Sequence, residues 1–344
     1  MNILVLAGGL SPERNVSLSS GSLIASALRR RGHKVLLLDV YEDCVIDGKD
    51  PSRMFTLEEG ETFLVSELVP DLEDIKRKNG GREALIGNGV LELCHFADVV
   101  YIALHGAMGE NGQLQATLDN FGIKYTGSGY VGSLLAMDKD ISKKILVQAG
   151  VKTPKWIYAS ANECNSAEIL SRIGLPCVVK PVSGGSSVGV SIVNTREELE
   201  EAFCDACKYE ANLIVEEKIE GREFTCGILE GRVLPPVEII PKEGFYDYKN
   251  KYQKGATTEI CPAPINEREL ADISEATSRA FDALRLSGYS RFDFIMDKEG
   301  VFWCLEANTL PGMTPTSLFP QEAAAVGIGY DELCEIIAKT GLEK

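Results

Sequence analysis

Long apolar runs are missing from this 344-residue sequence. No stretch reaches the roughly 18 consecutive apolar residues that a membrane-spanning helix needs, so no membrane partner is expected. The opening residues, MNILVLAGG, lack the basic start and the small-residue cleavage site of a secretory signal. A cytoplasmic location is therefore expected.

Paired cysteine motifs are also scarce. The ten cysteines are scattered singly apart from Cys204 and Cys207, which share one expected helix and have no second pair to complete a zinc site. This pattern is typical of reduced thiols in a cytoplasmic protein.

Positively charged residues are also fewer than negatively charged ones. Lys and Arg number 35 against 51 Asp and Glu, which gives a net charge of −16 at pH 7. Such a protein repels the phosphates of nucleic acids and anionic membranes, so neither is expected as a partner. An anionic small molecule would need local positive charge, which directs attention to lysines and arginines near glycine-rich loops.

The glycine fingerprint of a dinucleotide-binding domain is incomplete. An apolar strand at 3–6 ends in Gly-Gly at 8–9, and a helix at 17–31 and a strand at 34–40 follow, as in a βαβ unit. However, Leu-Ser-Pro at 10–12 stands where a third glycine would be required. The sequence predicts an α/β first module whose binding loops lie at the carboxyl ends of parallel strands.

Composition changes at Pro154, after which strands dominate. Residues 41–95 before it are expected to form only loops and short helices. The other strands are expected at 99–104, 155–159, 177–182, 188–193, 213–219, 223–229 and 233–240, with a hairpin at 290–308. Further helices are expected at 113–121, 165–173, 195–207 and 266–286.

The hairpin SRFDFIMDKEGVFWCLEANT at 290–309 has one polar face. A turn at 297–300 predicts the cross-strand pairs 292–305, 294–303 and 296–301. The opposite face then carries Arg291, Asp293, Cys304, Glu306 and Asn308. Carboxylate and amide oxygens on a rigid hairpin suit Mg²⁺, which is normally shared with substrate phosphates. The alternative, a solvated face with one Arg291–Glu306 ion pair, fits less well because Ile295 and Phe302 share that face.

The loop SGGSS at 183–187 lies between two expected strands. Small side chains let backbone N–H groups approach phosphate oxygens, and Lys180 stands just before the loop. No Gly-Lys-Ser/Thr follows, so this is not a Walker A loop. An interdomain linker would require the flanking strands to belong to separate domains. The pattern favours a mobile flap over a nucleotide.

Together these segments resemble the ATP-grasp fold and, within it, the D-alanine–D-alanine ligase family. The resemblance covers nearly the whole chain in co-linear order. Its motifs are AGGLSPERNVSL, IALHGAMGENGQLQ, YTGSG, AMDK, VVKPVSGGSSVGV, VEEKIEGREFT, GFYDYKNKY, CPAP, SRFDF and LEANTLPGMTPTSL. It implies an α/β protein with an N-terminal doubly wound (pre-ATP-grasp) domain at 1–133. It also implies a central ATP-grasp lobe with the flap at 134–214 and a C-terminal lobe with a metal and oxyanion site at 215–344.

The resemblance implies an ordered, ATP-dependent ligation. ATP phosphorylates the carboxylate of one D-alanine, the amine of a second attacks the acyl phosphate, and the dipeptide serves peptidoglycan synthesis. The expected cofactors are ATP as substrate and Mg²⁺ or Mn²⁺, with two ions. A homodimer formed through the first module is also expected. This chemistry depends on positioning and charge neutralisation.

The same resemblance implies roles for individual residues. The phosphates and the flap would involve Lys139, Lys180, Ser186, Ser187 and Lys251. Adenine and ribose would be held by Glu216, by the backbone of Glu217 and Ile219, and by Glu223. The metal ligands would be Asp293, Glu306 and Asn308, in agreement with the polar face of the hairpin. The first D-alanine would bind Glu13 and His105, the second Ser317 and Leu318. The oxyanion would bind Arg291 and the Gly312 N–H, and Ser186 and Tyr252 would link to Glu13 to close the site.

Several alternatives stay open. Asn15, Asn111 and Ala116 depart from residues common in the family and leave the preference of the first amino-acid site open. D-serine differs from D-alanine by one hydroxyl, which a pocket rejects poorly, whereas Tyr252 follows the D-alanyl-D-alanine rather than the D-lactate pattern. Another ATP-grasp carboxylate–amine ligase also remains open. A catalytically silent binding protein is disfavoured because binding alone needs no metal and oxyanion set.

Overall fold

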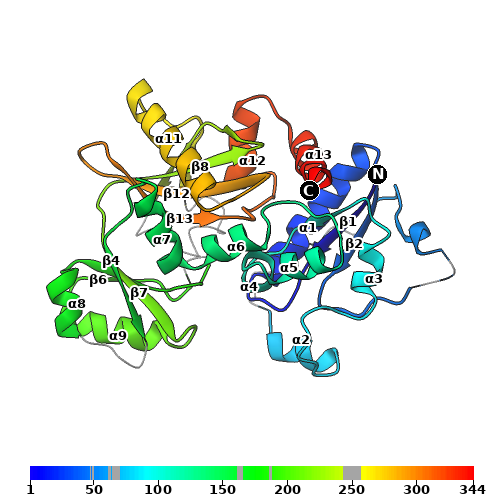
Figure 1. The fold of residues 1–344 in the computed structure, drawn as a ribbon, viewed down its shortest axis with the longest axis horizontal. Helices are drawn as coiled ribbons and strands as arrows, with labels where there is room; N and C mark the ends of the chain where they lie inside the picture. The colour runs from blue at the N-terminus through cyan, green and yellow to red at the C-terminus, as the bar shows by residue number, and fades with distance from the viewer. Residues whose placement is uncertain are drawn as a thin grey trace.

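The computed structural model describes residues 1–46, 48, 50–60, 63, 70–160, 166–185, 188–242 and 257–344. Within these ranges the strands form three sheets (Figure 1). The first is parallel with the order β2-β1-β3, and the second is antiparallel with the order β4-β7-β5-β6. The third is antiparallel with the order β11-β10-β8-β12-β13, and β9 pairs with β8. No helix in the described ranges is both long enough and apolar enough to cross a membrane.

The first sheet forms the α/β module predicted from the sequence. Its strands are β1 (Asn2–Ala7), β2 (Lys34–Asp39) and β3 (Val99–Ile102). Its helices are α1 (Arg14–Arg30), η1 (Pro51–Met54), α2 (Leu72–Lys78), α3 (Val90–Cys94), α4 (Ala107–Glu110) and α5 (Gln113–Asn120). Helix α1 begins three residues before its predicted start, directly after Glu13. The helix packs closely on the sheet at Gly21, where an added Cβ would lie only 2.6 Å from the Ala7 Cβ.

The C-terminal helix returns to the first module. α13 (Tyr330–Thr340) lies beside α1 (Figure 1), and Leu333 and Ile337 are buried in the core that contains β1 and β3. The Arg31 guanidinium pairs with Glu335 at 2.6 Å across this contact. The two ends of the chain therefore share one hydrophobic core, whereas the domain bounds implied by the family resemblance place them in separate domains.

The central sheet follows two helices, α6 (Tyr130–Met137) and α7 (Lys139–Gln148). Its elements are β4 (Trp156–Ser160), α8 (Ser166–Arg172), β5 (Cys177–Pro181), β6 (Ser191–Val193), α9 (Arg196–Ala206) and β7 (Asn212–Glu217). β7 pairs with β4 and β5 along its length, so the predicted boundary between residues 214 and 215 would cut a strand of this sheet. β6 starts at Ser191 rather than at 188, because the chain still turns at Gly189, where φ is +72°.

The third sheet carries the polar hairpin. Its elements are β8 (Arg222–Leu229), β9 (Arg232–Val233), β10 (Val237–Pro241), β11 (Thr257–Ile260), α11 (Glu267–Ala283), β12 (Tyr289–Met296) and β13 (Phe302–Asn308). α12 (Leu318–Ala325), α13 and η2 (Gly341–Glu343) end the chain. The strand predicted at 233–240 is two strands, because Pro235 and Pro236 have no backbone N–H for the ladder.

The predicted register of the hairpin is wrong. Asp293 pairs with Glu306 and Phe294 with Cys304, so a bulge leaves Leu305 as an extra residue. Cys304 is consequently buried in the core and not on the polar face. On the side of the bulge away from the turn, at residues 291–293 and 306–308, the pairing differs from the predicted register by two residues. A shift of two residues preserves the alternation of faces. Arg291, Asp293, Glu306 and Asn308 therefore still share one face.

Candidate active site

Two pockets share a wall beside the hairpin. One, the loop pocket, has a volume of about 540 Å³ and is lined by residues from the first module and the C-terminal segment. The other, the sheet pocket, has a volume of about 640 Å³ and lies between the second and third sheets. Lys139, Gly184 and Glu306 line both pockets. A molecule in one pocket can therefore meet a molecule in the other at these three residues.

Lys139 is the cation at this junction. It is the first residue of α7, whose N-terminus is capped by the Asp138 side chain accepting from the Ile141 N–H. Its ammonium donates to the Gly184 carbonyl at 2.5 Å and lies 3.4 Å from Glu306 Oε2. The helix start thus places one buried positive charge between Gly184 and the hairpin.

Asp293 on the hairpin accepts hydrogen bonds from three side chains. Arg291 donates to both of its oxygens, from Nε at 3.0 Å and from Nη2 at 3.1 Å. Asn308 Nδ2 donates at 3.0 Å and Thr225 Oγ1 at 2.8 Å. The polar face therefore holds Arg291, Asp293 and Asn308 in one hydrogen-bonded group, and Lys139 of α7 contacts its second carboxylate, Glu306.

Glu13 lies where three loops meet in the loop pocket. It directly precedes α1, and a Cβ on Gly106 or on Gly185 would lie 3.5 or 3.6 Å from Glu13 Oε2. His105 lines the same pocket, and its Nε2 is buried without a hydrogen-bond partner in the described part of the chain. Burial lowers the pKa of His105, an effect that the neighbouring Glu13 opposes.

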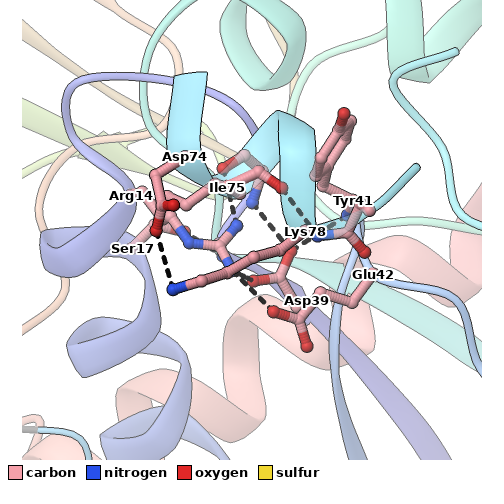
Figure 2. A network of polar contacts seen from close by, with 11 residues as sticks. Arg14, Ser17, Asp39, Tyr41, Glu42, Asp74, Ile75 and Lys78 are labelled. Atoms are coloured by element: carbon pink, nitrogen blue, oxygen red, sulfur yellow. Dashed lines mark hydrogen bonds and ion pairs between the residues drawn. The ribbon is translucent and has the colours of Figure 1, made fainter. Parts of the chain in front are cut away.

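A buried network fixes the loop that carries Glu13 (Figure 2). Arg14 pairs with Asp39 at 2.5 Å and with Glu42 at 3.0 Å, and donates to the Gly9 carbonyl at 2.9 Å. Asp39 in turn accepts from the N–H groups of Gly9 and Tyr41. The guanidinium thus ties the end of β1 to the end of β2, and it stands next to Glu13 in the chain.

Glu110 is a second acidic residue of the loop pocket. Its Oε2 accepts from the Gly106 N–H at 2.7 Å, which closes the turn after β3. Burial raises the pKa of Glu110 to about 8, and the charge of Glu13 adds to this rise. Near neutral pH this carboxyl is largely protonated, so it adds little negative charge beside Glu13.

Two lysines hold a buried carboxylate at the sheet pocket. Glu216 contacts the ammonium of Lys180 at 2.5 Å and that of Lys143 at 2.7 Å. Sequence reasoning selected Lys180 and Glu216 but missed Lys143. The available signal was its position four residues after Lys139, on the same face of α7. Glu217 Oε1 accepts from the Lys155 N–H at 2.8 Å, and Ile219 and Glu223 also line the sheet pocket.

The start of α12 closes the loop pocket. Ser317 precedes the helix, and its Oγ accepts from the Thr314 N–H at 3.2 Å. A Cβ on Gly312 would lie 3.1 Å from this Oγ, so the chain passes close to the helix start. Leu318 is buried in the pocket wall. Backbone N–H groups of a helix start favour an anionic group.

Sequence reasoning also missed a buried acid behind the polar face. Glu322 on α12 is 0% exposed, and a Cβ on Gly227 would overlap its carboxyl group. Burial raises the pKa of Glu322 well above its usual range. Gly227 pairs with Arg291, so this carboxyl lies on the arginine's face of the sheet.

Four predicted site residues cannot be placed. Ser186, Ser187, Lys251 and Tyr252 lie outside the described residues. The other predicted site residues all line the loop pocket or the sheet pocket.

The N-terminal and the C-terminal part of the chain each match a model of a known protein family. The family models described as D-ala D-ala ligase N-terminus and C-terminus match residues 2–128 and 145–339. A D-alanine–D-alanine ligase of Pediococcus pentosaceus is 43% identical over 341 residues, 98% of this chain and 96% of the relative. One of Lacticaseibacillus casei is 40% identical over 336 residues, 97% of this chain and 93% of the relative.

Solved structures agree with the sequence relatives. A D-alanine–D-alanine ligase of Bacillus anthracis complexed with ATP is similar with a TM-score of 0.77 at 31% identity, covering 100% of this chain and 97% of that chain. A D-Ala:D-Ser ligase of Enterococcus faecalis has a TM-score of 0.75 at 26% identity, covering 99% of each chain. The chain therefore has the ATP-grasp fold and belongs to the D-alanine–D-alanine ligase family.

Proposed function

We propose that this protein joins two D-alanine molecules into D-alanyl-D-alanine, using ATP and a D-alanyl phosphate intermediate. The observation that carries this proposal is the common wall of the two pockets at Lys139, Gly184 and Glu306. A phosphoryl group passing from a nucleotide to an amino acid has to cross such a junction. Family membership supplies the substrates, and the pocket geometry supports their placement.

ATP occupies the sheet pocket in this proposal. Lys139 and Lys180 neutralise its phosphates, and the flap at 183–187 covers them. Glu216 and the backbone of Glu217 and Ile219 hold adenine, and Glu223 holds the ribose hydroxyls. Lys251 reaches the transferred phosphate; its role rests on family resemblance alone. The wall of this pocket contains the buried cations Lys139 and Lys180 despite the net charge of −16, as an anionic ligand requires.

The two D-alanines occupy the loop pocket. Glu13 accepts the ammonium of the first, beside His105, and the protonated Glu110 adds little negative charge that would compete with it. The start of α12 at Ser317 and Leu318 receives the carboxylate of the second. Ser186 and Tyr252 link to Glu13 to close the site, on the basis of family resemblance.

Magnesium, or manganese, binds at the polar face, with two ions during turnover. Asp293, Glu306 and Asn308 fit this role because they offer carboxylate and amide oxygens on one rigid hairpin. The Asp293 carboxylate accepts from Arg291 and the Glu306 carboxylate lies beside Lys139, so both carboxylates already compensate positive charge. When bound, the metal supplies charge neutralisation for the phosphates.

The residues of the chain position and neutralise the reacting groups. A carboxylate oxygen of the first D-alanine attacks the terminal phosphorus of ATP, and ADP leaves. The amine of the second D-alanine then attacks the acyl carbon and loses a proton, and phosphate leaves with the electron pair of the C–O bond. Arg291 and the Gly312 N–H donate to the oxygen that becomes negative in between. This arrangement needs no nucleophile from the protein.

The cellular setting of the proposal is the cytoplasm, where ATP is available and thiols stay reduced. The nine described cysteines are free. We also propose a homodimer that forms through the first module. The dipeptide is a building block for peptidoglycan. An assay of ATP-dependent dipeptide formation from D-alanine tests the activity, and size-exclusion chromatography with light scattering tests the dimer.

A further inference from the structure

A fully buried lysine behind the sheet pocket takes no part in the proposed chemistry. The Lys143 side chain is 0% exposed, and its ammonium contacts Glu216 Oε2 at 2.7 Å. It also donates to Thr153 Oγ1 at 2.7 Å and to the Pro154 carbonyl at 3.3 Å. The Trp156 ring centroid lies 5.5 Å away. Lysine is rarely buried to this extent unless it is paired with a carboxylate. The role of Lys143 therefore depends on what it does to its partner, Glu216.

Glu216 stands between two ammonium groups. Lys180 contacts its other oxygen at 2.5 Å. Burial would raise the pKa of Glu216, but the charges of Lys143 and then Lys180 outweigh burial and lower the pKa. Burial lowers the pKa of Lys143, and Glu216 opposes that shift. Glu216 is therefore held as a carboxylate, and each of its oxygens has a second lone pair available.

The Glu216 carboxylate is on the pocket side of the central sheet. Glu216 on β7 pairs with Val178 on β5, and paired residues point to the same face. Lys180, two residues after Val178, shares that face. All three residues line the sheet pocket. Lys143 approaches from α7, so it covers one side of the carboxylate without lining the pocket itself.

We propose that Lys143 is a positioning residue that makes this pocket select adenine over other purines. The inference rests on the proposed binding of ATP in the sheet pocket. By keeping Glu216 ionised and fixed, Lys143 maintains an acceptor for the exocyclic amino group of adenine. The same carboxylate repels the carbonyl oxygen that hypoxanthine and guanine carry at that ring position. A site with a fixed buried acceptor discriminates strongly against a base that cannot donate to it.

Calorimetric titration of the full-length protein with ATP and with inosine triphosphate tests this inference, in the presence of Mg²⁺ and without D-alanine. The natural protein is expected to bind ATP at least about tenfold more tightly than inosine triphosphate. Lys143→Met is expected to weaken ATP binding by about tenfold and inosine triphosphate binding by less than about threefold. Lys144→Met is the matched control, because Lys144 is the next residue, its side chain is 64% exposed and it pairs with Asp140.

Equal affinity of the natural protein for both nucleotides would overturn the inference. So would a Lys143→Met protein that loses affinity for both to the same extent, since that result indicates a merely structural lysine. If Lys143→Met does not fold, Glu216→Gln keeps the side-chain shape and adds an N–H donor for the carbonyl of inosine triphosphate. Its preference for ATP is then expected to fall at least about fivefold, and an unchanged preference overturns the inference. Selective ATP binding without dipeptide formation would contradict the proposed ligase activity and leave this inference standing.

Discussion

The ammonium of Lys139 lies 3.4 Å from the Glu306 carboxylate, at the place where the loop pocket and the sheet pocket meet. Lys139 comes from the start of α7 and Glu306 from β13, on two different sides of the site. The pair brings a charge suited to phosphate next to a carboxylate suited to a metal ion. This junction is the physical basis of the proposed phosphoryl transfer.

Replacing Glu306 by glutamine tests the carboxylate side of the junction. Glu306→Gln removes one negative charge while keeping the side-chain shape, so phosphate release with ATP, Mg²⁺ and D-alanine is expected to fall at least about a hundredfold. Thermal unfolding should show an intact fold. Glu299→Gln, at the exposed turn of the same hairpin, is the matched control and should keep normal turnover. Near-normal turnover of Glu306→Gln would remove the metal assignment.

Removal of divalent metal should have the same effect without any substitution. Treatment with a chelator is expected to abolish phosphate release, and Mg²⁺ or Mn²⁺ should restore it. Circular dichroism before and after treatment serves as the control for folding. Full activity in an excess of chelator would contradict the assignment of a metal to Asp293, Glu306 and Asn308.

The network around Arg14 should control binding of the first D-alanine. Arg14→Lys cannot reproduce the contacts to both Asp39 and Glu42, so the free energy of unfolding should fall by about 1–3 kcal/mol. Because Glu13 is the next residue, the KM for D-alanine should rise more than the KM for ATP. Steady-state kinetics and chemical denaturation measure the two effects. Arg30→Lys at the more exposed pair with Asp331 should change stability by less than about 1 kcal/mol. Equal changes in both KM values would contradict the link to Glu13.

The raised pKa of Glu110 predicts that this residue destabilises the folded protein increasingly as pH rises. The folded protein holds a proton on this carboxyl up to a pKa of about 8, whereas the unfolded chain releases it near the model-peptide value of about 4.3. The folded state therefore binds more protons in this interval, and the contribution of Glu110 to stability falls as pH rises through it. Glu110→Gln cannot ionise, so its melting temperature relative to the natural protein should rise between about pH 5 and 8. A difference independent of pH, or one equal to that of the exposed-site control Glu92→Gln, would contradict the raised pKa.

The polar face of the hairpin could be predicted from the sequence, but its register could not. Alternation of Arg291 and Asp293 with phenylalanines defines the faces locally, and a shift of two residues leaves them unchanged. Next to the bulge at Leu305 the Cys304 N–H donates to the Lys152 carbonyl at 2.8 Å, a long-range contact that no local pattern contains. The bulge moves Cys304 into the core.

Long-range pairings are the other feature of the fold that local sequence patterns do not contain. The contact of Arg31 with Glu335 joins residues separated by nearly the whole chain, so periodicity could not reveal that α13 completes the first core. Lys143 likewise has the pattern of an ordinary helix lysine until the fold places Glu216 beside it. The residues carried over from the family motifs could be selected because the types and order of the motif residues are specific. The partners that hold them depend on packing.

The most direct test of the proposed function is a ligation assay with defined acceptors. The protein is incubated with ATP, Mg²⁺ and D-alanine, alone or with D-serine, D-lactate or L-alanine, and the products are identified by mass spectrometry while phosphate is measured. We expect D-alanyl-D-alanine as the main product, with one phosphate released per dipeptide and little product from L-alanine. Preferred incorporation of D-serine, equal turnover of L-alanine, or phosphate release without a dipeptide would contradict the account.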